Sequence, residues 1–160
     1  LQNLQQVPAA SYLGQLSDLR SLTISKCRSL EVLPASIGCL SRLTSLTLSG
    51  CNELLEVPHA IGGLTALHKL IVSRCMMLRA LHASLAGLWA LKELILINNY
   101  HLGDLDEGVL AGMESLHSLS ISMCSGMRCA AWLAAAGKQP TGSRADAQPQ
   151  VTLTRHPTVL

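Results

Sequence analysis

The chain has 160 residues and a formal net charge of +2, and it is 49% hydrophobic but only 2% aromatic, with no phenylalanine. This length corresponds to one domain or part of one. So few aromatic residues disfavour an irregular globular core and favour a regular one built from aliphatic side chains. The absence of a basic block gives no indication of binding to nucleic acid or to an anionic membrane. No apolar run is long enough to span a bilayer.

A leucine pattern recurs along the chain at a step of 24 residues. Successive units begin near the following positions: Leu16, Leu40, Leu64, Leu88 and Met113. Residues 1–15 match the second half of such a unit, so the chain is expected to begin inside a repeat and to be a fragment of a longer protein. Self-similarity at this period predicts a solenoid of stacked repeats.

Each unit carries the segment LxxLxL, in which apolar and polar residues alternate. In the first unit Leu22 and Ile24 are predicted to point inward, as expected for a short strand with one buried face. Pro34 follows and favours an extended residue before it. Ile37 and Leu40, three residues apart, then suit one turn of helix or 3₁₀ helix on the opposite side. The units therefore predict parallel strands, one per repeat, joined by a right-handed path.

The C-terminal part loses this pattern. Residues 129–136 suit a short helix ending at Gly137, residues 138–150 have the composition of a flexible segment, and residues 151–154 alternate weakly like a strand. We therefore expect a repeat region over residues 1–129, with about five repeats, and an irregular or flexible tail over residues 130–160.

The motifs LxxLxLxxC/N and LxxLP together resemble leucine-rich repeats. The longer form SxxLxxLPxxIGxLxxLxxLxLxxC, clearest in residues 30–51 and 54–75, resembles the repeats of plant intracellular disease-resistance receptors of the nucleotide-binding, leucine-rich-repeat class. The resemblance implies an α/β leucine-rich-repeat solenoid with parallel strands on the concave face and short helical or 3₁₀ turns on the convex side. His82 stands where the pattern has Pro, and residues 104–112 depart from it, so the convex turn of the fourth repeat is expected to differ.

In that family the repeats recognise a pathogen protein or a guarded host protein, so the resemblance implies a protein-recognition module of a plant-type innate immune receptor. The alternative is an adaptor or scaffold, such as a ubiquitin-ligase substrate receptor. The chain has no G-x-x-x-x-G-K-[ST] phosphate loop and no legible catalytic order among its histidines. We therefore expect no enzyme activity, no cofactor or metal, and no nucleic-acid or membrane partner. Other domains of a longer chain are further candidate partners.

Six cysteines occur, three of them in one slot: Cys27, Cys51 and Cys75. Asn99 fills this slot in the fourth unit, which favours a small polar side chain facing loop backbone over a metal or redox site. Neighbouring cysteines of such a ladder would be somewhat too far apart for an easy disulfide. With no visible signal peptide and no N-x-Ser/Thr sequon, the cysteines favour a reducing, cytoplasmic location.

The outward strand positions form columns across the stack, and a binding function is expected there. Repeats one and two place hydroxyl side chains in these columns, whereas repeats three and four place isoleucines in the open beside charged residues. An apolar centre with a charged rim is typical of protein-binding sites, although β-branched residues also favour strands without any binding role. The predicted protein-binding residues of the concave face are His68, Lys69, Ile71, Arg74, Lys92, Glu93, Ile95 and Ile97.

Two further features lie outside this face. Asp104, Asp106 and Glu107 form an acidic cluster that is either a solvated edge or a contact for a basic partner. Trp89 falls in a slot held elsewhere by Ser41, so it is expected to be partly exposed on the outer side. There it either packs on another domain or lies along the surface.

Overall fold

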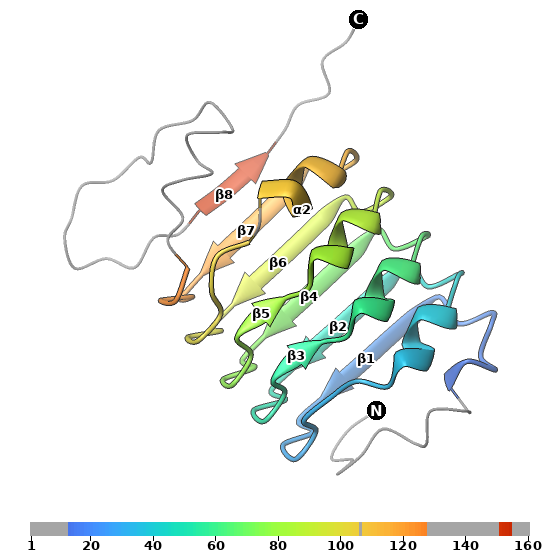
Figure 1. Cartoon of the computed structure of the whole chain (residues 1–160), viewed down its shortest axis with the longest axis horizontal. Helices are drawn as coiled ribbons and strands as arrows, with labels where there is room; N and C mark the ends of the chain where they lie inside the picture. Colours follow the sequence, from blue (N-terminus) through green and yellow to red (C-terminus); the bar gives the residue numbers. More distant parts are fainter. Residues whose placement is uncertain (1–12, 106, 128–150, 155–160) are drawn as a thin grey trace, which may run out of the picture.

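The computed structural model describes residues 13–105, 107–127 and 151–154. Its main element is a six-stranded sheet in the order β1-β2-β4-β6-β7-β8. Five of these strands are parallel, one from each repeat: β1 (Ser21–Ser25), β2 (Ser45–Ser49), β4 (Lys69–Ser73), β6 (Glu93–Ile97) and β7 (Ser118–Ser122). Strands with the same position in successive repeats therefore lie side by side (Figure 1).

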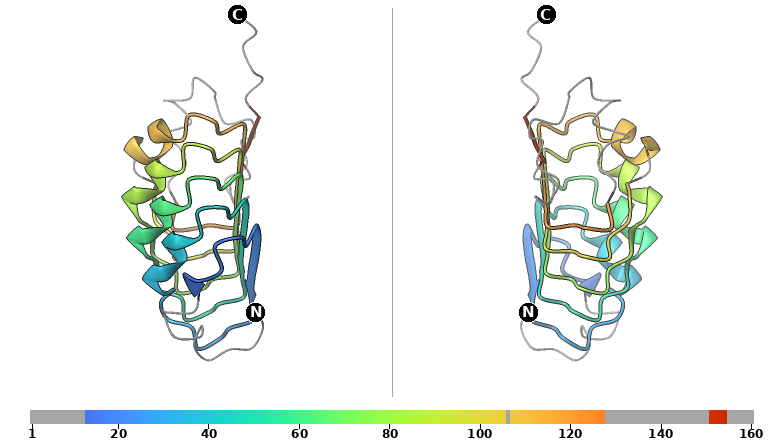
Figure 2. Two further views of the ribbon diagram at one scale, coloured as in Figure 1. Left: turned by 90° about the vertical axis from the view of Figure 1, so that its right-hand side faces the viewer. Right: turned by 90° about the vertical axis from the view of Figure 1, so that its left-hand side faces the viewer.

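Short helices form a second layer on the opposite side of the stack, which Figure 2 shows edge-on. They are η1 (Ala35–Cys39), η2 (His59–Gly63), η3 (Ala83–Gly87) and α2 (Glu107–Gly112). Two short parallel strands, β3 (Glu56–Val57) and β5 (Ala80–Leu81), precede η2 and η3. The two layers confirm the predicted arrangement of one strand and one short helical turn per repeat.

The core lies between these layers and repeats with the sequence. In the register of the sheet, Leu46 pairs with Leu70, and Leu70 pairs with Leu94. Because the side chains of a strand alternate between its two faces, each such column is buried along its length. Fully buried members of the two strand columns include Leu46, Leu48, Leu70, Val72, Leu94 and Leu96.

The 3₁₀ helices begin where the sequence supplies a residue with fixed φ. Pro34 and Pro58 precede η1 and η2 with φ of −66° and −64°. His82 precedes η3 with φ of −65°, and its Nδ1 accepts a hydrogen bond from the backbone N–H of Ser84 at 3.0 Å. The histidine thus keeps the conformation of the prolines and adds a side-chain cap.

The convex turn of the fourth repeat differs from the others, as expected from its sequence. It forms the α-helix α2 where the first three repeats form 3₁₀ helices.

In the earlier repeats the backbones of neighbouring turns approach closely: a Cβ atom added at Gly62 would lie 2.6 Å from the carbonyl oxygen of Ser84. Glycine at this slot therefore sets the spacing of the helix layer.

The predicted C-terminal strand is confirmed as β8 (Val151–Thr154). It pairs with β7 in the antiparallel direction, with Leu119 opposite Leu153, and occupies the edge of β7 that no repeat covers. The partial repeat at residues 1–12, the helix expected at 129–136 and the flexible segment expected at 138–150 lie outside the described residues.

Candidate protein-binding surface

The outward side chains of the five parallel strands form a continuous surface, which we call the strand face; it is the concave face of the sequence prediction. The sheet register aligns these side chains in three columns. The columns are Ser21, Ser45, Lys69, Glu93 and Ser118; then Thr23, Thr47, Ile71, Ile95 and Ser120; then Ser25, Ser49, Ser73, Ile97 and Ser122.

Three of the predicted residues form one apolar centre on this face. Ile71 lies opposite Ile95 on the neighbouring strand, and Ile97 lies two residues further along β6 on the same side. The structure corrects their exposure, since all three are half-buried instead of open. The reason is that strands about 4.8 Å apart bring the side chains of one column into contact, so that neighbours cover part of each isoleucine.

Two predicted charged residues neutralise each other. Lys69 and Glu93 occupy the same column on adjacent strands, and the Lys69 Nζ atom lies 2.7 Å from Glu93 Oε2. The side chains are 40% and 46% exposed, so this pair contributes little to stability. It sets the orientation of both side chains beside the apolar centre.

The other predicted charged or titratable residues border the strands. His68 and Lys92 directly precede β4 and β6, and Arg74 directly follows β4. Lys92 and Arg74 are exposed, whereas His68 is half-buried. The structure therefore brings all eight predicted residues to one region of the sheet, with the isoleucines in the middle and the cations at the ends of the strands.

Hydroxyl side chains on and beside the strand face, in repeats two and three, form hydrogen bonds with neighbouring repeats. Ser73 Oγ donates to Ser49 Oγ at 3.0 Å, and Thr44 Oγ1 donates to the carbonyl oxygen of Arg20 at 2.8 Å. These hydroxyls lie on a polar stretch beside the apolar centre. The strand face thus has two chemically different halves on one backbone.

The residue that follows each strand has a left-handed backbone conformation, which the sequence reasoning did not predict. Lys26, Arg74, Asn98 and Met123 have φ between 53° and 57°, and Gly50 in the same slot has φ of 67°. Each of the first four repeats uses the N–H of this residue to extend the sheet, as in the 2.9 Å bond from Arg74 N to the Ile97 carbonyl. Glycine and asparagine in this slot were the available signal, because both tolerate positive φ.

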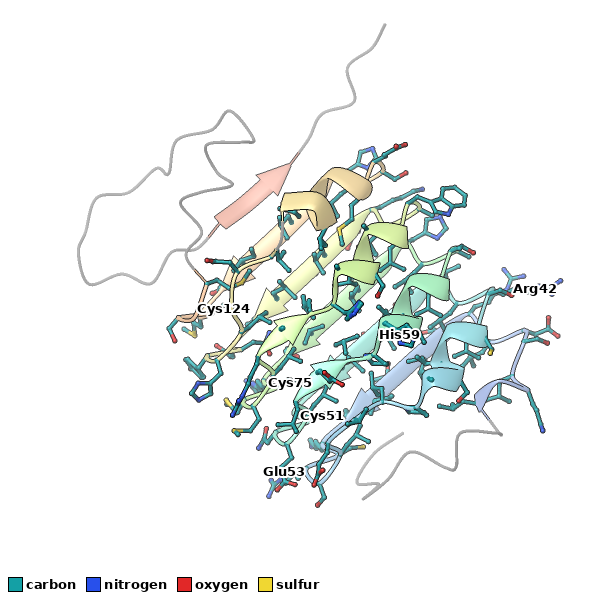
Figure 3. The ribbon with its side chains drawn as sticks, viewed as in Figure 1. Arg42, Cys51, Glu53, His59, Cys75 and Cys124 are labelled. Atoms are coloured by element: carbon teal, nitrogen blue, oxygen red, sulfur yellow. The ribbon has the colours of Figure 1, made fainter. Side chains whose placement is uncertain are left out.

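The cysteine ladder runs through the loops that follow the strands, where Figure 3 labels Cys51 after β2, Cys75 after β4 and Cys124 after β7. The side chains in this slot donate to backbone carbonyl oxygens: Cys124 Sγ to Leu96 at 3.6 Å, and Asn99 Nδ2 to Val72 at 2.9 Å. Asn99 Oδ1 also accepts from the Cys75 N–H at 3.0 Å. These bonds confirm the structural interpretation of the slot.

The described ladder thiols are buried, and none of them forms a disulfide. The five described cysteines are all free, and Cys39 alone among them is exposed. The side-chain hydrogen bond between Cys75 and Cys51 raises the pKa of Cys75, as does burial, and it lowers the pKa of Cys51 to about 7. Burial raises the pKa of Cys124. In the described part of the chain, no three or more His, Cys, Asp or Glu residues are grouped so that they could hold a metal ion.

Several exposed apolar side chains outside the strand face were partly or wholly missed from the sequence. Trp89 is 59% exposed, in agreement with its predicted outward position. The segments that connect the strands to the helix layer expose one large apolar side chain in each of the first four repeats: Val32, Leu55, Met77 and Tyr100. In the predicted acidic cluster Asp104 is exposed, and the side chains of Asp106 and Glu107 lie outside the described set.

Comparisons with known proteins identify the fold. No protein-family model matches the chain, and no curated protein matches it. Among solved structures, the leucine-rich repeat domain of the type III effector XopL matches with 28% identity and a TM-score of 0.58, over 80% of this chain and 52% of that one. A leucine-rich repeat protein of Leptospira interrogans matches with 24% identity and a TM-score of 0.45, over 73% and 40%.

The match to the XopL domain, together with the parallel sheet and its 3₁₀ turns, confirms the predicted leucine-rich-repeat fold. The chain spans about half the length of that domain. Leucine-rich-repeat domains are generally non-catalytic recognition modules that bind proteins. Within the described part of the chain, no helix has the length and hydropathy needed to cross a bilayer.

Proposed function

We propose that this chain recognises a protein partner through the strand face, with Ile71, Ile95 and Ile97 at the centre of the contact. The observation that carries the proposal is the contiguity of these isoleucines on a rigid sheet, flanked by charged side chains at the strand ends. A desolvated apolar centre with a polar rim is the usual anatomy of a protein interface. The predicted contact residues around the centre are His68, Lys69, Arg74, Lys92 and Glu93.

In this proposal the chain acts by binding alone, without a catalytic step or a cofactor, in the cytoplasm. Its best-supported biological setting is the ligand-sensing part of a plant-type innate immune receptor, because residues 30–51 and 54–75 carry the repeat form typical of that class. The structural match to the leucine-rich repeat domain of a type III effector is the reason for considering a second setting. The second candidate is an adaptor or scaffold with the same binding face.

The binding face can be tested with two pairs of substitutions. Ile71→Asp with Ile95→Asp places charge at the centre, and Ile71→Thr with Ile95→Thr copies the threonines that occupy the same column in repeats one and two. Ala35→Asp with Ala83→Asp is the matched control, because both alanines are exposed on the helix layer. Circular dichroism and thermal unfolding establish that each variant is folded.

The measurement is affinity, by calorimetry, for a purified partner that is selected with the wild-type protein alone, before any variant is tested. Both isoleucine variants should weaken binding by about 10-fold or more, as expected for residues at the centre of an interface, and the helix-layer control should not. If the control loses binding and the isoleucine variants keep it, the strand face is not the recognition surface. Reading the full-length transcript for a phosphate-loop domain or an F-box then separates the receptor from the adaptor.

A further inference from the structure

Charged side chains are divided unequally over the molecule. Among the residues whose side chains are described, the strand face and its two ends hold five of the eight lysines and arginines but only one of the seven carboxylates, Glu93. The five cations are Arg20, Lys26, Lys69, Arg74 and Lys92. The carboxylates on other surfaces are Asp18, Glu31, Glu53, Glu56, Asp104 and Glu114. The strand face is therefore cationic on a chain whose overall net charge is only +2.

Four of these five cations have no carboxylate partner within the described part of the chain. Glu93 is already paired with Lys69, and the other ion pair of the described residues joins Arg42 to Asp18, which lie three residues before β2 and β1. The four remaining cations, Arg20, Lys26, Arg74 and Lys92, are all exposed. Their charge is available to a partner.

The four cations lie along two rims. Arg20 and Lys92 directly precede β1 and β6, and Lys26 and Arg74 directly follow β1 and β4. A strand of five residues separates the rims, so Arg20 and Lys26 are six residue steps apart, which corresponds to about 20 Å. The apolar centre and the hydroxyl columns fill the space between them.

The rim that follows the strands has its cations at positions where the backbone conformation is unfavourable for residues other than glycine. Lys26 and Arg74 have φ of 57° and 54°, a region that costs a non-glycine residue about 1 kcal/mol or more. Gly50 shows that glycine fits the same slot in the second repeat. Within the described residues these two side chains form no ion pair, so their charge is better explained by an external ligand than by stability.

We propose, building on the binding face proposed above, that the partner presents an acidic segment of protein to the strand face. Its apolar side chains contact Ile71, Ile95 and Ile97, and its carboxylates lie against the cations of the two rims. Complementary charge of this kind steers association and disfavours basic partners more than it adds affinity. The acidic character of the segment is thus the selective feature.

The same face is poorly suited to nucleic acid. Single-stranded nucleic acid is usually bound by aromatic side chains on which bases stack, together with a basic groove. None of the described outward strand residues is aromatic, since Trp89 and Tyr100 lie outside the strands. The apolar isoleucine centre would also remain uncovered by a phosphate backbone. A protein segment satisfies both the centre and the rims.

A random 12-residue peptide library displayed on yeast tests the proposal with the full chain as bait. Selected binders should be enriched in Asp and Glu relative to the unselected library. Their affinity should fall by about 10-fold or more between low and physiological salt, because exposed charge pairs are screened. Arg74→Glu with Lys92→Glu should cause a similar loss, whereas Arg28→Glu with Arg79→Glu, on exposed residues outside the strand face, should change affinity by less than about 2-fold.

The outcomes separate this inference from the proposed function. Binders that depend on Ile71 and Ile95 but are neutral or basic, or that resist the rim substitutions, overturn the acidic partner and leave the binding face intact. Recovery of no peptide that depends on either pair overturns both. A parallel selection with a random single-stranded DNA library should yield no ligand sensitive to Arg74→Glu with Lys92→Glu, and such a ligand would contradict the choice of a protein partner.

Discussion

Two sets of side-chain columns run through the same strands: the inward columns are nearly constant from repeat to repeat, and the outward columns vary. Leu46, Leu70 and Leu94 occupy one inward column without change, whereas Thr47, Ile71 and Ile95 occupy the outward column beside it. The inward residues are buried and the outward ones are half-buried, although they share one backbone and one register. The inward columns therefore specify the fold, whereas the outward columns can vary from repeat to repeat without changing it.

The largest difference in stability between inward and outward substitutions is expected at two adjacent residues of β2. Leu48 is fully buried, so Leu48→Ala should lower the free energy of unfolding by about 2–5 kcal/mol through lost burial and the cavity left behind. Thr47→Ala, at the adjacent outward position, should change it by less than about 0.5 kcal/mol. Urea unfolding followed by circular dichroism measures both. Equal losses would show that the outward column also supports the fold.

A buried polar slot should be nearly as sensitive as the leucine columns. Asn99→Ala removes the partners of the Cys75 N–H and the Val72 carbonyl, both buried, and should cost about 2–4 kcal/mol. Asn99→Cys copies the residue of the other repeats and should cost about half as much, since a thiol donates a weak bond but accepts poorly. Ser73→Ala, which removes the hydroxyl pair with Ser49 on the strand face, should cost less than about 1 kcal/mol.

Thiol reactivity should distinguish the buried cysteine ladder from the exposed Cys39. In a Cys129→Ser background, Cys39 should react with iodoacetamide at least about 100-fold faster than Cys51, Cys75 or Cys124, because the ladder reacts only when the repeat opens. The pKa of Cys51 is lowered to about 7. At pH 8 protonation therefore does not protect this thiol from alkylation, and its protection depends on burial. The pKa of Cys75 is raised, which keeps that thiol protonated. Mass spectrometry at pH 8 that shows rapid labelling of Cys51 would contradict its burial.

The features that recur at the repeat period could be predicted from the sequence. Period-two alternation located the strands, the spacing of Ile37 and Leu40 after Pro34 located the 3₁₀ turn, and Asn99 identified the role of the cysteine slot. The period also placed Lys69 beside Glu93, although their pairing could be seen only once the register was known. These features depend on local chemistry repeated at a constant step.

The features that the sequence did not predict depend on neighbours that are not repeated. The half-burial of Ile71 and Ile95 comes from mutual cover between strands. The antiparallel pairing of β8 with β7 joins segments far apart in the chain, a contact that no periodicity indicates. The division of charge between faces likewise emerges only when all the columns are seen together.

The smallest expected change in stability is the most informative, because at Arg74 the stability of the fold and the proposed binding role favour different residues. Arg74→Gly relieves a left-handed backbone position and should raise the free energy of unfolding by about 0.5–1 kcal/mol, while Gly50→Ala in the same slot should lower it by a similar amount. A Cβ atom at Gly50 would meet only ordinary contacts, the nearest at 3.7 Å, so any loss there reports backbone strain. If Arg74 serves recognition, Arg74→Gly gains stability and loses affinity for acidic peptides in the same protein. A variant that gains stability and keeps its affinity would show that the cation at this slot has no part in binding, and the argument from retained strain would then fail for Lys26 as well.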